Sequence, residues 1–215
     1  MTVADTSLAR IGSLRILFVM AAPSEYGAQL QARIRPLICG VGPVESGIST
    51  AAALTTLAQG GSLPDLVFSL GSAGSRTLEH AGVYQVASVR YRDMDASPLG
   101  FEKGATPFAD HPAVIIIPQR IQEIPAATLS TGAAIISGVA YDRTETDMVD
   151  MECFAVLRAA HRYGIPTIGL RGISDGRAAL TRLGDWTHAL SLIDQRLAAA
   201  IDLFDSQVRD GRFTL

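Results

Sequence analysis

Three carboxylates that follow expected β-strands are the side chains best placed for chemistry in this chain. Glu152 comes directly after a short β-rich run, Asp175 closes a longer apolar run, and Glu25 follows the first apolar run. In α/β proteins, ligands bind outside the carboxyl ends of parallel strands. Carboxyl groups held there can act as the acid and the base of one reaction. We therefore expect Glu152 and Asp175 to touch the same ligand.

Each of these carboxylates also has an ordinary structural role open to it. Glu152 can cap the following helix, Asp175 can open a loop, and Glu25 lies in a first helical turn, where the dipole favours negative charge. Other chemistries have less support. The four histidines share no spacing with acids, no P-loop motif occurs, and Cys39 and Cys153 form neither a disulfide framework nor a metal knuckle. We expect no metal and no cofactor.

The elements that must position these residues follow from the hydrophobic pattern. Short β-rich runs alternate with helical patterns, which predicts a largely parallel sheet covered on both faces. No linker or repeat interrupts the pattern, so we expect one domain over residues 1–215. The predicted strands are Arg15–Met20, Arg35–Gly40, Asp65–Leu70, Gly82–Tyr91, Ala134–Ser137, Met148–Met151 and Thr167–Ser174, with Val114–Ile117 either a strand or part of a connection. The predicted helices are Ser24–Ile34, Val44–Gln59, Glu152–Tyr163 and His188–Ser206.

The composition narrows the class of protein. The 215 residues are 48% hydrophobic and carry a net charge of −3, which suits a buried sheet and offers no basic surface for nucleic acid. The first apolar run, Ile16–Met20, is too short to cross a bilayer, and no signal-peptide pattern precedes it. We expect a cytoplasmic protein that binds neither nucleic acid nor membrane.

Two glycine-rich stretches follow expected strands. Gly40-Val41-Gly42 opens a helix, but its glycine spacing does not match a dinucleotide fingerprint. The run Gly71–Gly74 follows a central apolar strand, and its small residues would let main chain pack against a flat ligand, with Ser72 offering a hydroxyl. The alternative is a plain tight turn, because glycine adopts positive φ at no steric cost.

A series of short motifs, in order along most of the chain, carries a resemblance to a known family. The motifs are Ala21–Glu25, Gly40–Gly42, Gly71–Gly74, Tyr91–Asp95, Ser137–Tyr141, Val149–Glu152 and Arg171–Asp175. Together they resemble the nucleoside phosphorylase/nucleosidase superfamily, and within it the 5′-methylthioadenosine/S-adenosylhomocysteine nucleosidases. The resemblance implies a single-domain three-layer sandwich with a mixed, mostly parallel central sheet. It also implies an N-ribosyl hydrolase that releases adenine from a 5′-substituted adenosine.

The resemblance also implies a role for each site residue. Asp175 would protonate N7 of adenine, Glu25 would activate the attacking water, and Glu152 would hold the ribose hydroxyls. Met151 would pack on the sugar, and Tyr141 would stack on the purine. The remaining substrate-binding residues implied are Asp150, Ala140, Ser72, Ala73, Gly74, Val41, Ala22, Ser174, Arg171 and Trp186.

Several departures and alternatives stay open at this level. The segment between Glu25 and Gly40 is shorter than in relatives, Asp150 stands where they often carry Glu, and the region Arg177–Trp186 is reshaped. In that region Trp186 would close over the 5′ substituent, while Arg177 would suit a carboxylate on the substrate.

The reaction itself has alternatives. A guanidinium suits phosphate, so Arg76, just past the Gly71–Gly74 run, keeps a phosphate-dependent purine nucleoside phosphorylase open. A futalosine-type substrate and a nucleoside-binding protein without turnover are further alternatives. The resemblance implies a homodimer in which Phe101 and Pro107 reach the neighbouring active site; an ordinary surface loop is the other interpretation.

Overall fold

The computed structural model describes residues 7–176, 178 and 181–215, and its centre is a nine-stranded mixed sheet. The strands are β1 (Ala9–Ile11), β2 (Leu14–Met20), β3 (Leu37–Ile38), β4 (Leu66–Gly74), β5 (Val83–Tyr91), β6 (Val114–Ile116), β7 (Ala126–Thr131), β8 (Met148–Asp150) and β9 (Thr167–Asp175). The helices are α1 (Ala28–Gln31), α2 (Pro43–Gln59), α3 (Cys153–His161), α4 (Leu183–Thr187) and α5 (Leu190–Arg209), with 3-10 turns η2 (Pro23–Glu25), η3 (Ser97–Leu99) and η4 (Gly138–Arg143).

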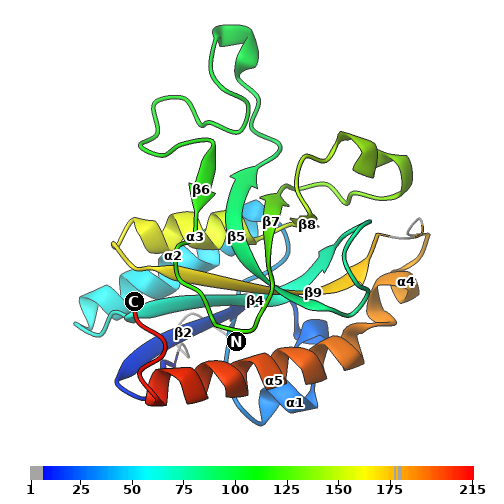
Figure 1. Ribbon diagram of the computed structural model, residues 1–215. Coiled ribbons are helices and arrows are strands. Elements are labelled where there is room, and N and C mark those ends of the chain that lie inside the picture. Colours follow the sequence, from blue (N-terminus) through cyan, green and yellow to red (C-terminus); the bar gives the residue numbers. More distant parts are fainter. Residues whose placement is uncertain (1–6, 177, 179–180) are drawn as a thin grey trace.

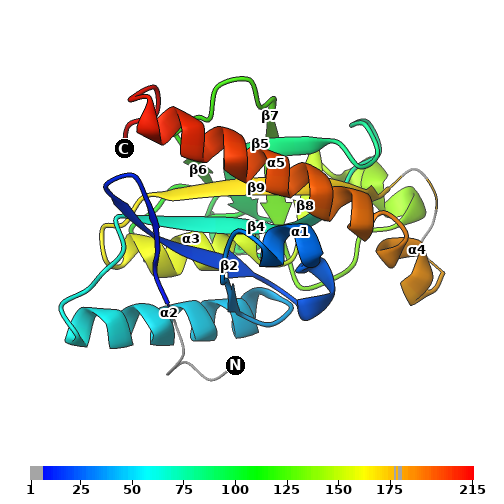
Figure 2. The same ribbon diagram turned by 90° about the horizontal axis from the view of Figure 1, so that it is seen from below.

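Helices cover both faces of the sheet, as the sequence predicts. Helices α2 and α3 lie on one face, and α1 and α5 lie on the other (Figures 1 and 2). Alternate residues of the central strands point to opposite layers. Leu17 and Val67 pack with the α2 and α3 side, whereas Phe18 and Phe68 stack at 5.4 Å and pack with the α5 side, where Phe204 meets Phe68 edge-on. The central strands β2, β4 and β9 are largely apolar because both of their faces are buried.

The strand pairing closes on itself beside the open part of the sheet. Strand β4 pairs with β9, β9 with β5, β5 with β7, β7 with β8, and β8 returns to β4. The closing bridge joins Gly74 to Val149, and Gly74 also pairs with Asp175 across a register shift. The ends of β4, β8 and β9 are thereby held together, although they are far apart in sequence.

The structure corrects two expected elements. Ala134–Ser137 is not a strand; the strand is β7, and Ile135 is 68% exposed in an irregular segment. The predicted helix Ser24–Ile34 divides into η2 and the short α1. The break falls at Gly27, where a Cβ atom would lie 2.5 Å from the Asp194 carboxyl group.

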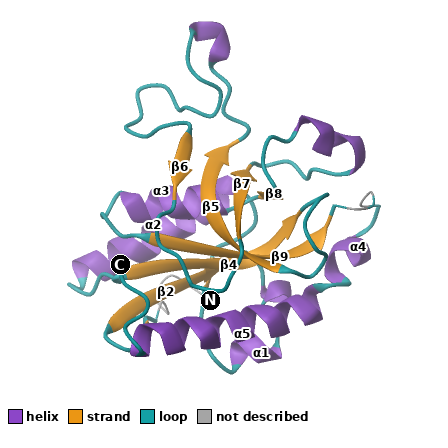
Figure 3. Cartoon of the chain, in the orientation of Figure 1, coloured by secondary structure: helices purple, strands orange, loops and turns teal. Residues whose placement is uncertain are grey.

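The remaining differences are extensions rather than errors of type. The run Gly71–Gly74 is not a turn but the end of β4. Val114–Ile116 is a strand, which decides between the two interpretations of that segment. The connection between β5 and β6 extends away from the sheet (Figure 3). Among the described residues, no helix is long and apolar enough to cross a membrane.

Candidate active site

A pocket of about 590 Å³ lies at the carboxyl ends of β4, β8 and β9. Because the strand pairing joins these ends, residues from across the sequence meet in one wall. Most of the predicted site residues line it: Ala22, Glu25, Val41, Ser72, Ala73, Gly74, Asp150, Met151, Glu152, Ser174, Asp175 and Trp186. The three carboxylates Glu25, Glu152 and Asp175 therefore share one cavity.

Glu25 is buried and is held by the end of β4. Its Oε1 atom accepts hydrogen bonds from the Ser72 amide and the Ser72 hydroxyl, each at 2.7 Å. Its Oε2 atom is buried and has no hydrogen-bond partner among the described residues. Burial raises the pKa of Glu25, although the Ser72 hydrogen bonds and the Arg171 charge oppose the shift. A carboxylate that lines a pocket and has a raised pKa can act as a general base.

Asp175 ends β9 and is held on both of its oxygens. The Ser174 hydroxyl donates to Oδ1 at 2.7 Å, and the Tyr141 hydroxyl makes a long hydrogen bond of 3.4 Å to Oδ2. Burial and the neighbouring Asp175 charge raise the pKa of Tyr141, so this hydroxyl keeps its proton near neutral pH. A Cβ atom at Gly74 would lie 2.0 Å from the Tyr141 hydroxyl, which explains the glycine there.

Glu152 precedes α3 and reaches the opposite wall of the pocket. Its Oε1 atom accepts a hydrogen bond of 2.9 Å from the Gly42 amide. Gly42 has a φ of +94°, a conformation that favours glycine, so the Gly40-Val41-Gly42 motif presents an amide to this carboxylate. Burial, then the charge of Asp150 and then that of Glu25, raise the pKa of Glu152 to about 7.

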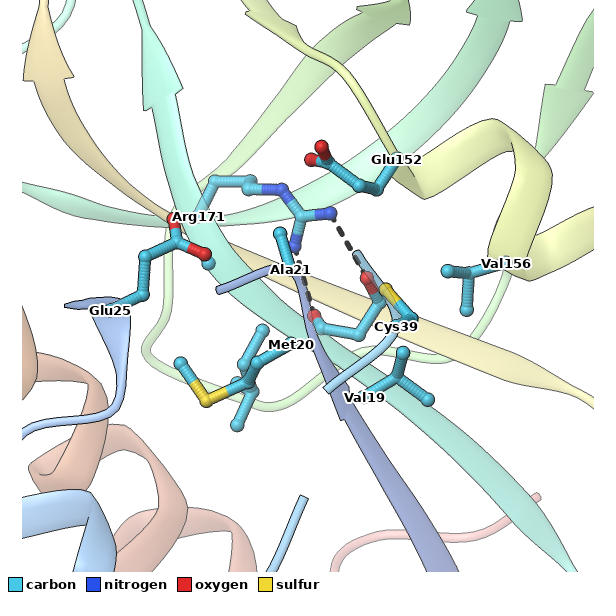
Figure 4. Close-up of a pocket in the computed structure, with 11 residues that line it drawn as sticks. Val19, Met20, Ala21, Glu25, Cys39, Glu152, Val156 and Arg171 are labelled. Atoms are coloured by element: carbon cyan, nitrogen blue, oxygen red, sulfur yellow. Dashed lines mark hydrogen bonds between the residues drawn. The ribbon is translucent and has the colours of Figure 1, made fainter. Parts of the chain in front are cut away.

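Arg171 and Asp150 form a buried ion pair beneath the pocket. Arg171 donates to Asp150 Oδ2 through Nε and Nη2, at 3.1 and 2.8 Å. The Asp150 carboxylate also accepts from the Thr131 hydroxyl and the Cys153 amide. Figure 4 shows the Arg171 guanidinium between Glu25 and Glu152. The Asp150 carboxylate is thus paired and hydrogen-bonded, as a buried charge must be. The ion pair is a structural feature of the floor of the site.

The raised pKa of Glu152 predicts a pH dependence of stability. The folded state binds this proton more tightly than the unfolded state, so the contribution is complete below the ordinary value of 4.5 and is lost as the pH rises through about 7. We expect the free energy of unfolding to fall by about 1–3 kcal/mol across this window in the wild type, and by less in Glu152→Gln. Urea denaturation at both ends of the window measures it. A Glu102→Gln control, at an exposed position, should follow the wild type. Equal slopes for Glu152→Gln and wild type would contradict the assignment.

Three predicted site residues lie outside the pocket lining. Arg171 is fully buried in the site floor, and Ala140 is exposed on η4. Tyr141 turns its hydroxyl to Asp175, and the Arg76 guanidinium lies 5.6 Å from the centre of its ring. Substrate contacts of these residues, including the stacking of Tyr141 on a purine, stay predictions. Arg177 lies outside the described residues.

Sequence reasoning missed several residues that line the pocket, Arg92 foremost. Arg92 donates to the carbonyl groups of Ser130, Gly132, Ala134 and Asp150 and so fixes the wall that contains Ile135 and Ile136. Burial lowers its pKa. The available signal was its place in the Tyr91–Asp95 motif, just past a strand. Thr181 and Arg182 also line the pocket, beside Trp186.

Comparison with known proteins decides the family. The model of the phosphorylase superfamily matches residues 31–202. The chain belongs to the phosphorylase superfamily. It is 30% identical over 156 residues to the 5′-methylthioadenosine/S-adenosylhomocysteine nucleosidase of Haemophilus influenzae (strain PittEE), a match over 64% of this chain and 66% of that protein. The match thus spans just under two thirds of the length of that curated relative.

Solved structures of the phosphorylase superfamily confirm the predicted fold. A Colwellia psychrerythraea 5′-methylthioadenosine/S-adenosylhomocysteine nucleosidase in complex with adenine superposes with a TM-score of 0.70 at 19% identity, covering 93% of this chain and 97% of that one. A futalosine hydrolase mutant of Helicobacter pylori superposes with a TM-score of 0.70 at 16% identity, covering 87% and 98%. The α/β architecture with a mixed, mostly parallel sheet is therefore that of this superfamily.

Proposed function

We propose that this protein is a purine nucleosidase that hydrolyses the N-ribosidic bond of a 5′-substituted adenosine, of the 5′-methylthioadenosine or S-adenosylhomocysteine type, and releases adenine. The observation that carries the proposal is the convergence of Glu25, Glu152 and Asp175 on one pocket. The names of the relative and of the structural neighbours support it. We propose that residues 1–215 act as one domain without a metal or cofactor.

The proposed reaction uses the carboxylates in separate roles. Asp175 donates a proton to N7 of the purine, and the bond between C1′ and N9 breaks with its electron pair leaving on adenine. Glu25 takes a proton from water, whose oxygen forms the new bond to C1′. Positive charge develops on the ribose, and nearby carboxylates stabilise it. Glu152 accepts hydrogen bonds from the ribose hydroxyls, with Met151 against the sugar.

The surroundings of Arg76 favour hydrolysis over phosphorolysis. Arg76 pairs with Asp142, donates to the Gly138 carbonyl group and lies over the Tyr141 ring, and it is not among the residues that line the pocket. The cationic residues that do line it, within the described part of the chain, are Arg92 and Arg182. Both Nη atoms of Arg92 donate hydrogen bonds to backbone carbonyl groups. A phosphate would therefore have to rely on a cation other than Arg76.

The 5′ end of the substrate is assigned to the region of Trp186 and Arg182. Both residues line the pocket, but they belong to a different segment of the sequence from Glu152, the carboxylate proposed to hold the ribose. A thioether would pack against the indole of Trp186, and a carboxylate on a longer 5′ substituent would meet Arg182. Comparing kcat/KM for 5′-methylthioadenosine, S-adenosylhomocysteine and futalosine tests this assignment. Identical values in wild type and Arg182→Ala for all three would contradict a role for Arg182.

We propose a homodimer and a cytoplasmic location. Val44 and Ile48 are exposed one turn apart on α2, Val41 is an exposed residue of the pocket just before this helix, and Phe108 is 99% exposed in the segment between β5 and β6. Large exposed apolar side chains that cluster are typical of interfaces between proteins. Sedimentation as a monomer at micromolar concentration would contradict the dimer, and cell fractionation tests the location.

The experiment that tests the proposed function measures adenine release with and without phosphate. We expect the purified protein to release adenine from 5′-methylthioadenosine at the same rate in phosphate-free buffer and in phosphate. Strict dependence on phosphate would identify a phosphorylase instead. No release from any of the three nucleosides would leave a nucleoside-binding protein without turnover.

A further inference from the structure

We propose that Trp186 is a positioning residue that fixes the Ser72 hydroxyl and, through it, the ionisation of Glu25. The inference rests on the proposed function for its kinetic consequence, because there Glu25 is the base. The geometry that carries it is a chain of hydrogen bonds from α4 to the carboxylate. Trp186 Nε1 donates to Ser72 Oγ at 2.9 Å, and Ser72 Oγ lies 2.7 Å from Glu25 Oε1.

The direction of every hydrogen bond in this chain is fixed by chemistry. An indole nitrogen is only a donor, so the Ser72 oxygen must accept from Trp186. A serine hydroxyl has a single proton, which is then directed to the Glu25 carboxylate. The Ser72 amide donates to the same carboxylate oxygen. Oε1 thus receives two donors from Ser72.

The indole is well placed to hold this arrangement. Trp186 is half-buried and packs against the apolar cluster on the α5 side of the sheet. It also lines the pocket, so a ligand there touches the donor directly. Ser72 is 114 residues away in sequence, at the end of β4. The position of Trp186 on α4 therefore affects the Glu25 carboxylate through the Ser72 hydroxyl group.

Other ionisable groups near Glu25 come from four parts of the chain. The Arg171 charge on β9 lowers the pKa of Glu25, whereas the Glu25 charge raises the pKa of Glu152, before α3, and of the Cys39 thiol, after β3. On α5, which packs against η2, the Asp194 carboxylate is engaged by the amides of Gln29 and Leu30. Among the groups the structure describes around Glu25, Ser72 is the one whose hydroxyl donates to its carboxylate. The indole decides where that hydroxyl points.

Loss of the indole donor should therefore raise the pKa of Glu25. Without Trp186 Nε1 the Ser72 hydroxyl is free to rotate, and its donation to the carboxylate weakens. Hydrogen bonds to the charged form lower the pKa of an acid, so weakening one raises it. Glu25, the base, is then protonated up to a higher pH, and the acidic limb of the pH profile of kcat/KM moves to higher pH.

The first test is spectroscopic and needs no turnover. Trp186 is the one tryptophan of the chain, so an amide correlation spectrum of the ¹⁵N-labelled protein holds a single indole peak. We expect that peak to move in Ser72→Ala and to titrate with pH in the wild type. The titration should vanish in Glu25→Gln and persist in Glu152→Gln. The proposal would be overturned if the indole peak had the same position in Ser72→Ala as in the wild type, or if it still titrated with pH in Glu25→Gln.

The second test is kinetic and uses Trp186→Phe, which keeps an aromatic ring and removes the donor. We expect the acidic limb of kcat/KM to move up by about 0.5–1 pH unit, with a loss of about 3–10-fold on that limb and recovery at higher pH. In a Ser72→Ala background the substitution should cause no further shift of the acidic limb. His188→Gln, exposed and outside the pocket, should keep the wild-type profile. An equal loss at every pH would show that Trp186 only packs. If wild type releases no adenine, the proposed function fails while the spectroscopic test still decides the inference.

Discussion

Replacing Asp175 by Asn is expected to reduce kcat for adenine release by about 10²–10⁴-fold, with a much smaller change in substrate affinity. Asn keeps the shape of the side chain and its contact with the Ser174 hydroxyl, but it cannot transfer a proton to the purine. The leaving group would then depart as an anion, which is far less favourable. Because the proton moves only in the transition state, the loss should fall on kcat. Single-turnover adenine release, with a binding titration of the same variant, measures both quantities.

The control for this substitution is chemically identical but remote. Asp202→Asn lies on the exposed side of α5, where the carboxylate pairs with Arg33. We expect it to retain wild-type kcat. If Asp175→Asn keeps more than about a tenth of the wild-type kcat, the residue is not the acid, since general acid catalysis contributes at least about a hundredfold.

Replacing Glu25 by Gln is expected to have an effect of similar size, for a different reason. The amide cannot accept the proton of the attacking water, so hydrolysis should fall by about 10²–10⁴-fold. Glu79→Gln, at a side chain that is 72% exposed, is the matched control. A Glu25→Gln variant with near-normal hydrolysis would remove Glu25 from the mechanism and leave water activation to another group.

The wild-type pH profile gives a second check on Glu25. Burial raises the pKa of Glu25, so its charged form, which acts as the base, appears only above the ordinary range of glutamate. We expect kcat/KM to rise with pH along a limb that lies above about 4.3. An acidic limb at or below that value would contradict the burial of the base.

The sequence predicted the fold class and most of the residues that line the pocket, but not the contacts that bring them together. The carboxylates at strand ends, and the glycines next to them, were recognisable because strand ends bear ligands in this class of fold. What no local pattern shows is the bridge between Gly74 and Val149, which closes the ring of strands and brings the ends of β4 and β8 together. Such contacts join segments far apart in the chain, and hydrophobic periodicity carries no information about them.

Two individual residues show where the prediction stopped. Asp150 lines the pocket as expected and its substrate contact stays a prediction, but the sequence does not show that its carboxylate pairs with Arg171, 21 residues later, and accepts from the Thr131 hydroxyl. The error at Ala134–Ser137 has a related cause. Its apolar residues read as a strand, yet Ile135 faces the pocket and solvent rather than the core. In both cases a tertiary contact, rather than the local residue type, decides the role.

The central claim is that water, directed by Glu25, attacks C1′ of a purine nucleoside. The most direct test lets the enzyme cleave 5′-methylthioadenosine in ¹⁸O-enriched water with phosphate present. Mass spectrometry then measures the mass of the sugar product. We predict a free 5-methylthioribose that carries one ¹⁸O atom at C1′ when quenched early, at the same rate with or without phosphate. A sugar 1-phosphate, or a product whose formation requires phosphate, would contradict the account.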